Sequence, residues 1–212
     1  EEQIAEITAL NDKWKGIDHA KAREAIVRWV RETGNKVLIC PEMTYQVDIM
    51  DELLIDPLPD DVKRNVVKRG YWLPDEAASL YSKAFCVLSF ECHSPIISLR
   101  NGTPAFYLRQ PEDTIKGQMY YDLGFDNWVF EINNTTGKQI ADRLMEVYSD
   151  YDSAQAYRKR GMDKASELFD MGVKIVLNSY KQIREYLFKM DIPFWKDLHI
   201  QGQKRTSLFS DM

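Results

Sequence analysis

The chain has 212 residues, 44% of them hydrophobic and 29% charged, with a formal net charge of −5 at pH 7. This acidic balance argues against general nucleic-acid binding, which needs a basic surface, but not against a small anionic ligand at a local basic site. No apolar run reaches membrane-spanning length. Three cysteines without framework spacing, Cys40, Cys86 and Cys92, predict reduced thiols and a cytoplasmic protein.

The chain opens with two predicted helices. Apolar spacing indicates one over residues 4–14 and a second over 18–32, with Asp18 as its N-cap and Gly34 as its end. Residues 36–40 predict a buried strand, 47–54 a helix, 56–60 a proline-containing turn and 65–68 a short strand. Pro74 suits the first turn of the next helix.

Strands and helices continue to alternate after that. Residues 85–89, 104–108 and 128–130 predict strands, while helices are expected from Ser94 and over 115–121. Because strands separated by helices form parallel βαβ units, we expect an α/β fold with a Rossmann-like parallel sheet of about five strands, flanked by helices.

The remainder predicts a helical C-terminal extension. One helix is expected over 136–148 and more over 153–190, divided at Gly172, with inward positions that include Tyr157, Leu168, Val176, Tyr180 and Ile183. We therefore expect a lobe over residues 1–150, C-terminal helices packing on it over 151–200, and a flexible tail over 201–212.

Ligands of open parallel sheets bind beyond the carboxyl ends of the strands, where helix N-termini point inward. The polar residues at these positions could converge on one cleft. They are Glu42 and Tyr45 after the first strand, Glu91, His93 and Ser94 after the third, and Arg109, Gln110 and Lys116 after the fourth.

His93 is the sharpest catalytic candidate. With Ser94 as a helix cap and Pro95 in the first turn, it would lie just before a helix N-terminus, where a neutral imidazole is favoured. Such a residue can donate to an anion or act as an acid or base. The alternative is a histidine that is only hydrogen-bonded to a loop backbone.

The charged neighbours of His93 can each be interpreted in more than one way. Glu91 could pair with Arg109 or Lys116, hydrogen-bond a sugar hydroxyl, or be a surface acid. Arg109 and Lys116 could neutralise a phosphate or carboxylate together, or be solvated surface charges.

Other chemistries lack their signatures in this sequence. Cys92 and His93 are adjacent on an extended segment and point to opposite faces, so Cys92 is expected to pack in the core. Three cysteines and three histidines at wide spacing give no zinc signature, and we expect no metal site. No phosphate-binding glycine loop or dinucleotide fingerprint is present, and no cofactor is expected.

Residues 71–132 resemble the C-terminal lobe of the polysaccharide pyruvyl transferase family. That family shows a Ser-x-Arg-x-His-Ser type segment, a Gly-x-Pro turn into a strand, and then Lys-Gly-x-Met and Asp-Leu-Gly steps. The residues that match in order are Ser89, His93, Ser94, Gly102, Pro104, Lys116, Gly117, Met119, Asp122, Leu123 and Gly124.

The resemblance implies one lobe of a GT-B-like fold that acts in surface-polysaccharide biosynthesis. It implies transfer of a pyruvyl group from phosphoenolpyruvate to a saccharide acceptor, with His93 contacting or protonating the donor and Lys116 holding its phosphate or carboxylate. The family's N-terminal lobe has no counterpart here. We therefore expect the isolated lobe to be inactive and to need that partner.

One position departs from the family pattern, since Glu91 stands where the family has an arginine. This reversal of charge keeps two alternatives open. One is a GT-B glycosyltransferase or sugar-nucleotide enzyme with a nucleotide-sugar donor, in which an acidic residue near the donor sugar is familiar. The other is a non-catalytic binding domain of the same fold.

Overall fold

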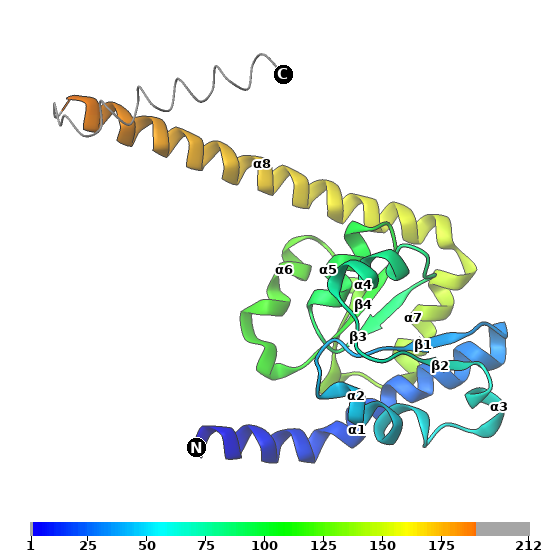
Figure 1. Ribbon diagram of the computed structural model, residues 1–212. Coiled ribbons are helices and arrows are strands. Elements are labelled where there is room, and N and C mark those ends of the chain that lie inside the picture. Colours follow the sequence, from blue (N-terminus) through cyan, green and yellow to red (C-terminus); the bar gives the residue numbers. More distant parts are fainter. Residues whose placement is uncertain (1, 190–212) are drawn as a thin grey trace. The chain divides into compact units, whose positions relative to one another are not determined.

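The computed structural model describes residues 2–189 and the side chains of residues 8–10, 12–186 and 189 (Figure 1). The chain divides into two compact units, Glu1–Asp163 and Lys164–Met212. The predicted tail at 201–212 lies outside the described residues. Within residues 2–189, no helix combines the length and apolarity that crossing a membrane requires.

Unit 1 is an α/β unit in which the five described strands are parallel to their partners. They form two sheets, β1–β2 and β3–β4–β5, rather than the single five-stranded sheet that we expected. The strands are β1 (Val37–Ile39), β2 (Val66–Lys68), β3 (Val87–Ser89), β4 (Ala105–Arg109) and β5 (Val129–Glu131). Four of them have only three residues, too few for long hydrogen-bonded ladders, and no ladder joins β1 to β3 among the described residues.

Helices connect these strands in the order that the alternating pattern predicts, which places the unit in the Rossmann-like α/β class in general. In the first half they are α1 (Glu2–Thr33), α2 (Gln46–Met50), a π-helical turn (Asp51–Ile55), α3 (Asp60–Lys63) and α4 (Pro74–Tyr81). In the second half they are α5 (His93–Arg100), α6 (Gln118–Asp122), α7 (Gly137–Ser149), α8 (Tyr151–Lys189) and 3-10 turns over Pro111–Gly117, Asp126–Trp128 and Ile132–Asn134.

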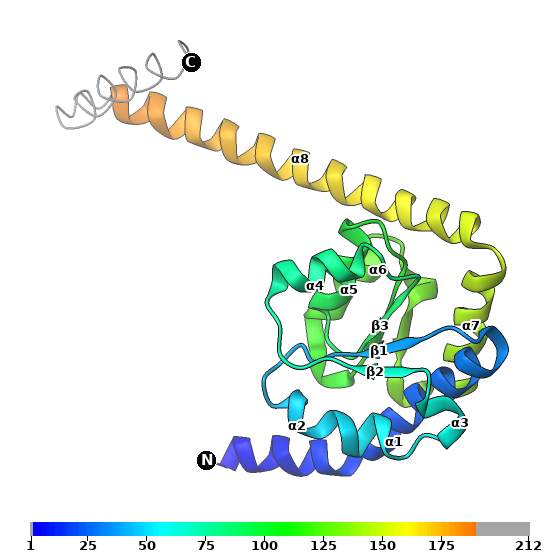
Figure 2. The same cartoon turned by 45° about the vertical axis from the view of Figure 1, so that its right-hand side comes forward.

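Two layers of helices cover the strands (Figures 1 and 2). On one side α1 and α7 pack together against Leu108 and Ile132, both fully buried. On the other side α4 and α5 pack together, and Trp72, Tyr81 and Val87 form part of the apolar contact beneath them. The central strand β4 is the most buried of the five, because its residues Ala105 to Leu108 are covered on both sides.

The helix caps show which sequence signals were reliable. Gly34 adopts a φ of +70° and its N–H donates to the carbonyl of Val30, which ends α1 as predicted. Thr136 caps α7 reciprocally with Gln139. Pro74 is at the start of α4, as predicted.

The two predicted N-terminal helices are one continuous helix, so the assignment of Asp18 as an N-cap is wrong. Asp18 is an interior helical residue, 1% exposed, and burial raises the pKa of its carboxyl. The predicted division at Gly172 is also wrong, since α8 runs unbroken from Tyr151 to Lys189. One glycine costs a helix only about 1 kcal/mol, which neighbouring residues can outweigh.

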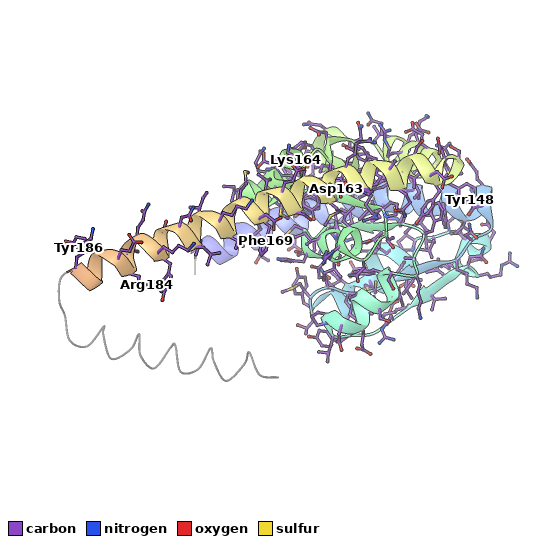
Figure 3. The ribbon with its side chains drawn as sticks, turned by 90° about the horizontal axis from the view of Figure 1, so that it is seen from above. Tyr148, Asp163, Lys164, Phe169, Arg184 and Tyr186 are labelled. Carbon is purple, nitrogen blue, oxygen red and sulfur yellow. The ribbon has the colours of Figure 1, made fainter. Side chains whose placement is uncertain are left out.

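The described part of unit 2 is residues 164–189 of α8, on which Figure 3 labels Lys164, Phe169, Arg184 and Tyr186. Several positions predicted to face inward are exposed, among them Leu168, Val176, Tyr180 and Ile183. These residues do recur at helical spacing, but the spacing alone does not mean that another element covers them. Tyr157, in the first half of α8, is partly buried against Phe125 and Trp128 as predicted.

Candidate functional site

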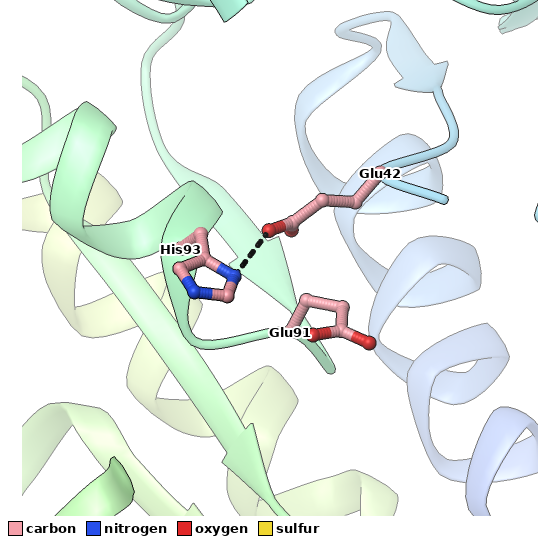
Figure 4. A group of neighbouring side chains, drawn as sticks. All are labelled: Glu42, Glu91 and His93. Atoms are coloured by element: carbon pink, nitrogen blue, oxygen red, sulfur yellow. Dashed lines mark ion pairs between the residues drawn. The ribbon is translucent and has the colours of Figure 1, made fainter. Parts of the chain in front are cut away.

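The carboxyl ends of β1 and β3 meet, and three predicted site residues gather there. Glu42 lies three residues beyond β1, and Glu91 and His93 follow β3. One ligand-type atom from each side chain lies within 4.8 Å of the other two. Figure 4 shows the imidazole and the two carboxylates gathered at this edge. The expected convergence of polar residues at strand ends is therefore present for these three.

Glu42 is held in place by a chain of buried hydroxyl groups. The Oγ of Ser94 donates to Oε2 of Glu42 at 2.6 Å and lies 2.9 Å from the hydroxyl of Tyr81. The side-chain amide oxygen of Gln46 accepts from the N–H of Glu42 and thereby fixes the backbone as well. Ser94 does not cap the helix, contrary to the prediction, because its hydroxyl is used for this network.

His93 begins α5, after Cys92 at the cap position, so the helix starts one residue earlier than predicted. Its Nδ1 lies 3.2 Å from Oε1 of Glu42, and the two form an ion pair when the imidazole is protonated (Figure 4). The side chain is 65% exposed. With Nδ1 facing Glu42, the other ring nitrogen, Nε2, is left for a ligand.

Glu91 lies in a field of mixed charges. Burial raises the pKa of its carboxyl, and the carboxylates of Glu42 and Asp113 raise it further, while His93 and Lys116 act in the opposite direction. Its backbone N–H donates to the hydroxyl of Ser89 at 3.0 Å, which fixes the turn after β3. The charge of Lys116 therefore reaches this cluster, although its side chain is exposed.

The other predicted ligand residues are placed differently. Arg109 forms an ion pair with Glu131 at 2.5 Å and donates to the carbonyl of Thr114, so it is paired within the protein instead of acting with Lys116. Gln110 contributes its N–H to Asp113 at 2.9 Å. Tyr45 is 57% exposed at the start of α2.

Two neighbours of the site were missed in the sequence. Tyr81 supports Ser94 from the end of α4, and burial raises the pKa of its phenol to about 12. Asp113 accepts from the hydroxyl of Tyr107 at 2.5 Å and adds negative charge near Glu91. Nothing in the sequence pattern distinguished either residue as part of a site, because each reaches it from a separate element.

The cysteines occupy protected positions. Cys92 is 5% exposed, as predicted for a core residue, and its carbonyl accepts from the hydroxyl of Tyr120. Burial raises the pKa of the Cys40 thiol to about 11 and that of Cys86 to about 12. These thiols are therefore poor nucleophiles at neutral pH.

The arrangement at this edge offers an imidazole for proton transfer, two carboxylates that can hold a cation or accept from hydroxyl groups, and one nearby lysine. No protein family, curated protein or solved structure matches the chain.

Proposed function

We propose that this chain is the C-terminal lobe of a GT-B-like group transferase related to the polysaccharide pyruvyl transferases. In this proposal the lobe, together with an N-terminal lobe, transfers a pyruvyl group from phosphoenolpyruvate to hydroxyls of a surface saccharide. The observation that carries it is the position of His93, which combines an exposed ring with a carboxylate partner on Nδ1 at the carboxyl end of β3. The ordered match of Ser89, His93, Lys116 and the glycine steps supports the same assignment.

The finer fold assignment belongs to the same proposal. The short sheets β1–β2 and β3–β4–β5 correspond to parts of one Rossmann-like lobe, and the Glu42–Ser94 hydrogen bond connects them at the ligand edge. A second lobe would supply the acceptor side of the cleft. The lobe described here would then supply the acid–base groups.

The residues have separate tasks in the reaction. Formation of the ketal adds two acceptor hydroxyls to C2 of phosphoenolpyruvate, places one of their protons on C3 and releases phosphate with the other. His93, through Nε2, is suited to carry a proton between these groups. Glu42, Ser94 and Tyr81 are positioning residues that hold the imidazole, and Lys116, whose charge acts on Glu91, would neutralise the phosphate.

Binding calorimetry with phosphoenolpyruvate tests the assignment, on the longest gene product that contains this chain. His93→Ala and Lys116→Ala should each weaken binding at least about tenfold, equivalent to about 1.4 kcal/mol. Lys83→Ala is the matched control, because this exposed lysine precedes β3 at its opposite end. Equal effects of Lys83→Ala and Lys116→Ala would contradict the proposed donor site.

A second candidate is a nucleotide-sugar donor, and the excess of carboxylates favours it. Glu42, Glu91 and Asp113 surround a site with one lysine, and carboxylates suit sugar hydroxyls better than the trianionic phosphoenolpyruvate. UDP-glucose in the same calorimeter distinguishes the two donors. A gain of phosphoenolpyruvate affinity in Glu91→Arg would support a pyruvyl transferase site that has lost the arginine of the family. Failure of both ligands would favour a non-catalytic binding domain.

A further inference from the structure

The cluster of Glu42, Glu91 and His93 has the donor geometry of a metal site. Its atoms come from two segments, one after β1 and one after β3, and lie within 4.8 Å of one another. Bonds of divalent zinc to imidazole nitrogen and carboxylate oxygen are about 2.0–2.2 Å, so neighbouring ligand atoms of a tetrahedral ion are about 3.4 Å apart. Side-chain movements of about 1 Å bring the cluster into this range.

A buried oxygen in the cluster lacks a hydrogen bond. Within the part of the chain that the structure describes, Oε1 of Glu42 is shielded from solvent and accepts no hydrogen bond, although Nδ1 of His93 lies 3.2 Å away. Its twin, Oε2, is satisfied by Ser94. A buried acceptor without a hydrogen bond is costly, and a cation bound to Oε1 would relieve this cost.

Supporting hydrogen bonds already surround this position. Ser94 donates to the Glu42 carboxylate and is itself in contact with the Tyr81 hydroxyl, and the Ser89 hydroxyl fixes the backbone of Glu91. Partners of this kind orient metal ligands and are characteristic of metal sites. The lysine that acts on Glu91 is the exposed Lys116, whose flexible side chain can move away.

We propose that Glu42, Glu91 and His93 bind one first-row divalent cation, with water completing its coordination. Two carboxylates and one imidazole form a mixed donor set that suits Mn²⁺ and Zn²⁺ better than Ca²⁺, which prefers oxygen alone. Where the proposed function holds, the cation would also cancel the negative charge of the two carboxylates and admit a phosphate-bearing donor. That consequence rests on the proposed function, whereas the metal site does not.

Titration of the untagged chain with Mn²⁺, followed by water-proton relaxation and without any donor, tests the site. Mn²⁺ is chosen because thiols are poor ligands for it, so the three cysteines do not compete. We expect one equivalent to bind, with affinity lowered at least tenfold in Glu91→Gln and in His93→Asn. A rise in melting temperature with Mn²⁺ that these two variants lose provides an independent readout, valid even if a variant is less stable.

Glu112→Gln is the matched control, because it removes the same charge from an exposed residue outside the three ligands. Unchanged affinity in this control supports the site. Absence of binding up to about 1 mM Mn²⁺, or equal weakening in Glu112→Gln and Glu91→Gln, would overturn it. Since no donor is present, failure of phosphoenolpyruvate or UDP-glucose to bind leaves this result untouched and bears only on the proposed function.

Discussion

At the scale of single residues, Ser94 links Glu42 to Tyr81 at the candidate site. It is 5% exposed, donates to Glu42 and contacts the hydroxyl of Tyr81. Ser94→Ala leaves both partners short of a hydrogen bond, and we expect the free energy of unfolding to fall by about 1–3 kcal/mol in urea denaturation. Ser79→Ala, on the exposed face of α4, should change it by less than about 0.5 kcal/mol. Equal effects of the two substitutions would contradict the network.

His19 should make the stability of the folded chain depend on pH in a defined direction. Burial lowers the pKa of its imidazole, and the hydrogen bond to the carbonyl of Lys15 only partly opposes this. The folded chain therefore binds a proton at His19 less readily than the unfolded chain. The stability contributed by neutral His19 is present above its ordinary pKa of about 6.5 and is lost as the pH falls below it.

The measurement compares wild type with His19→Phe, which keeps a ring stacked on Phe90. Urea denaturation at about pH 7.5, 6.5 and 5.5 gives the free energy of unfolding of each chain. The difference in free energy of unfolding, wild type minus variant, should decrease steadily as the pH is lowered. A difference that is flat or increases toward pH 5.5 would show that His19 is not buried as described.

Residues of the candidate site could be predicted only where their position directly after a strand decides their place in the fold. Glu42, Glu91 and His93 follow strands, and the general rule for parallel sheets brings such residues to one edge. The pairing of Arg109 with Glu131 was not predictable, because it joins neighbouring strands β4 and β5 whose register no pattern specifies. The rule brings Glu42 to the pair after β3 across 49 to 51 positions, but it does not give the distances between side-chain atoms that make a metal-type cluster.

At the scale of elements, the strands and most helices were predicted, and the errors concern where helices break and which strands pair. The predicted breaks before Asp18 and at Gly172 lie inside the continuous helices α1 and α8. A polar residue of capping type and a single glycine both occur in helix interiors, so neither ends a helix by itself. The splitting of the sheet was missed because hydrophobic runs mark strands but do not say which strands pair.

Substitutions at two glycines of α8 distinguish the effect of packing on stability from the effect of helix propensity. A Cβ at Gly161 would approach Phe125 to 2.2 Å, whereas Gly172 has open space. Gly161→Ala should lower the free energy of unfolding by about 1–3 kcal/mol through overpacking. Gly172→Ala should not lower it, and should raise the helix signal at 222 nm, because alanine favours helix by about 1 kcal/mol. The reverse order of stability would contradict the packing of α8 on Phe125.

At the scale of the whole molecule, the buried apolar residues that the structure describes lie in unit 1. Its last buried apolar residue is Ala154, and the exposed apolar residues of unit 2 include Phe169, Ile175 and Val176. A chain that ends at Asp163 should therefore unfold cooperatively, with a denaturation midpoint close to that of the full chain. Loss of cooperative unfolding in this shortened chain would show that residues after 163 complete the core.

The central claim is that Glu42, Glu91 and His93 form one ligand site at the carboxyl ends of β1 and β3. Long-range ¹H–¹⁵N spectra of the histidine side chains during titration with Zn²⁺ test it most directly. The account predicts that the ring nitrogens of His93 shift once Zn²⁺ exceeds what the three cysteines can bind, that those of His19 stay unchanged, and that Glu91→Gln suppresses the His93 shift. His93 signals that stay unmoved at such an excess of Zn²⁺ would contradict it.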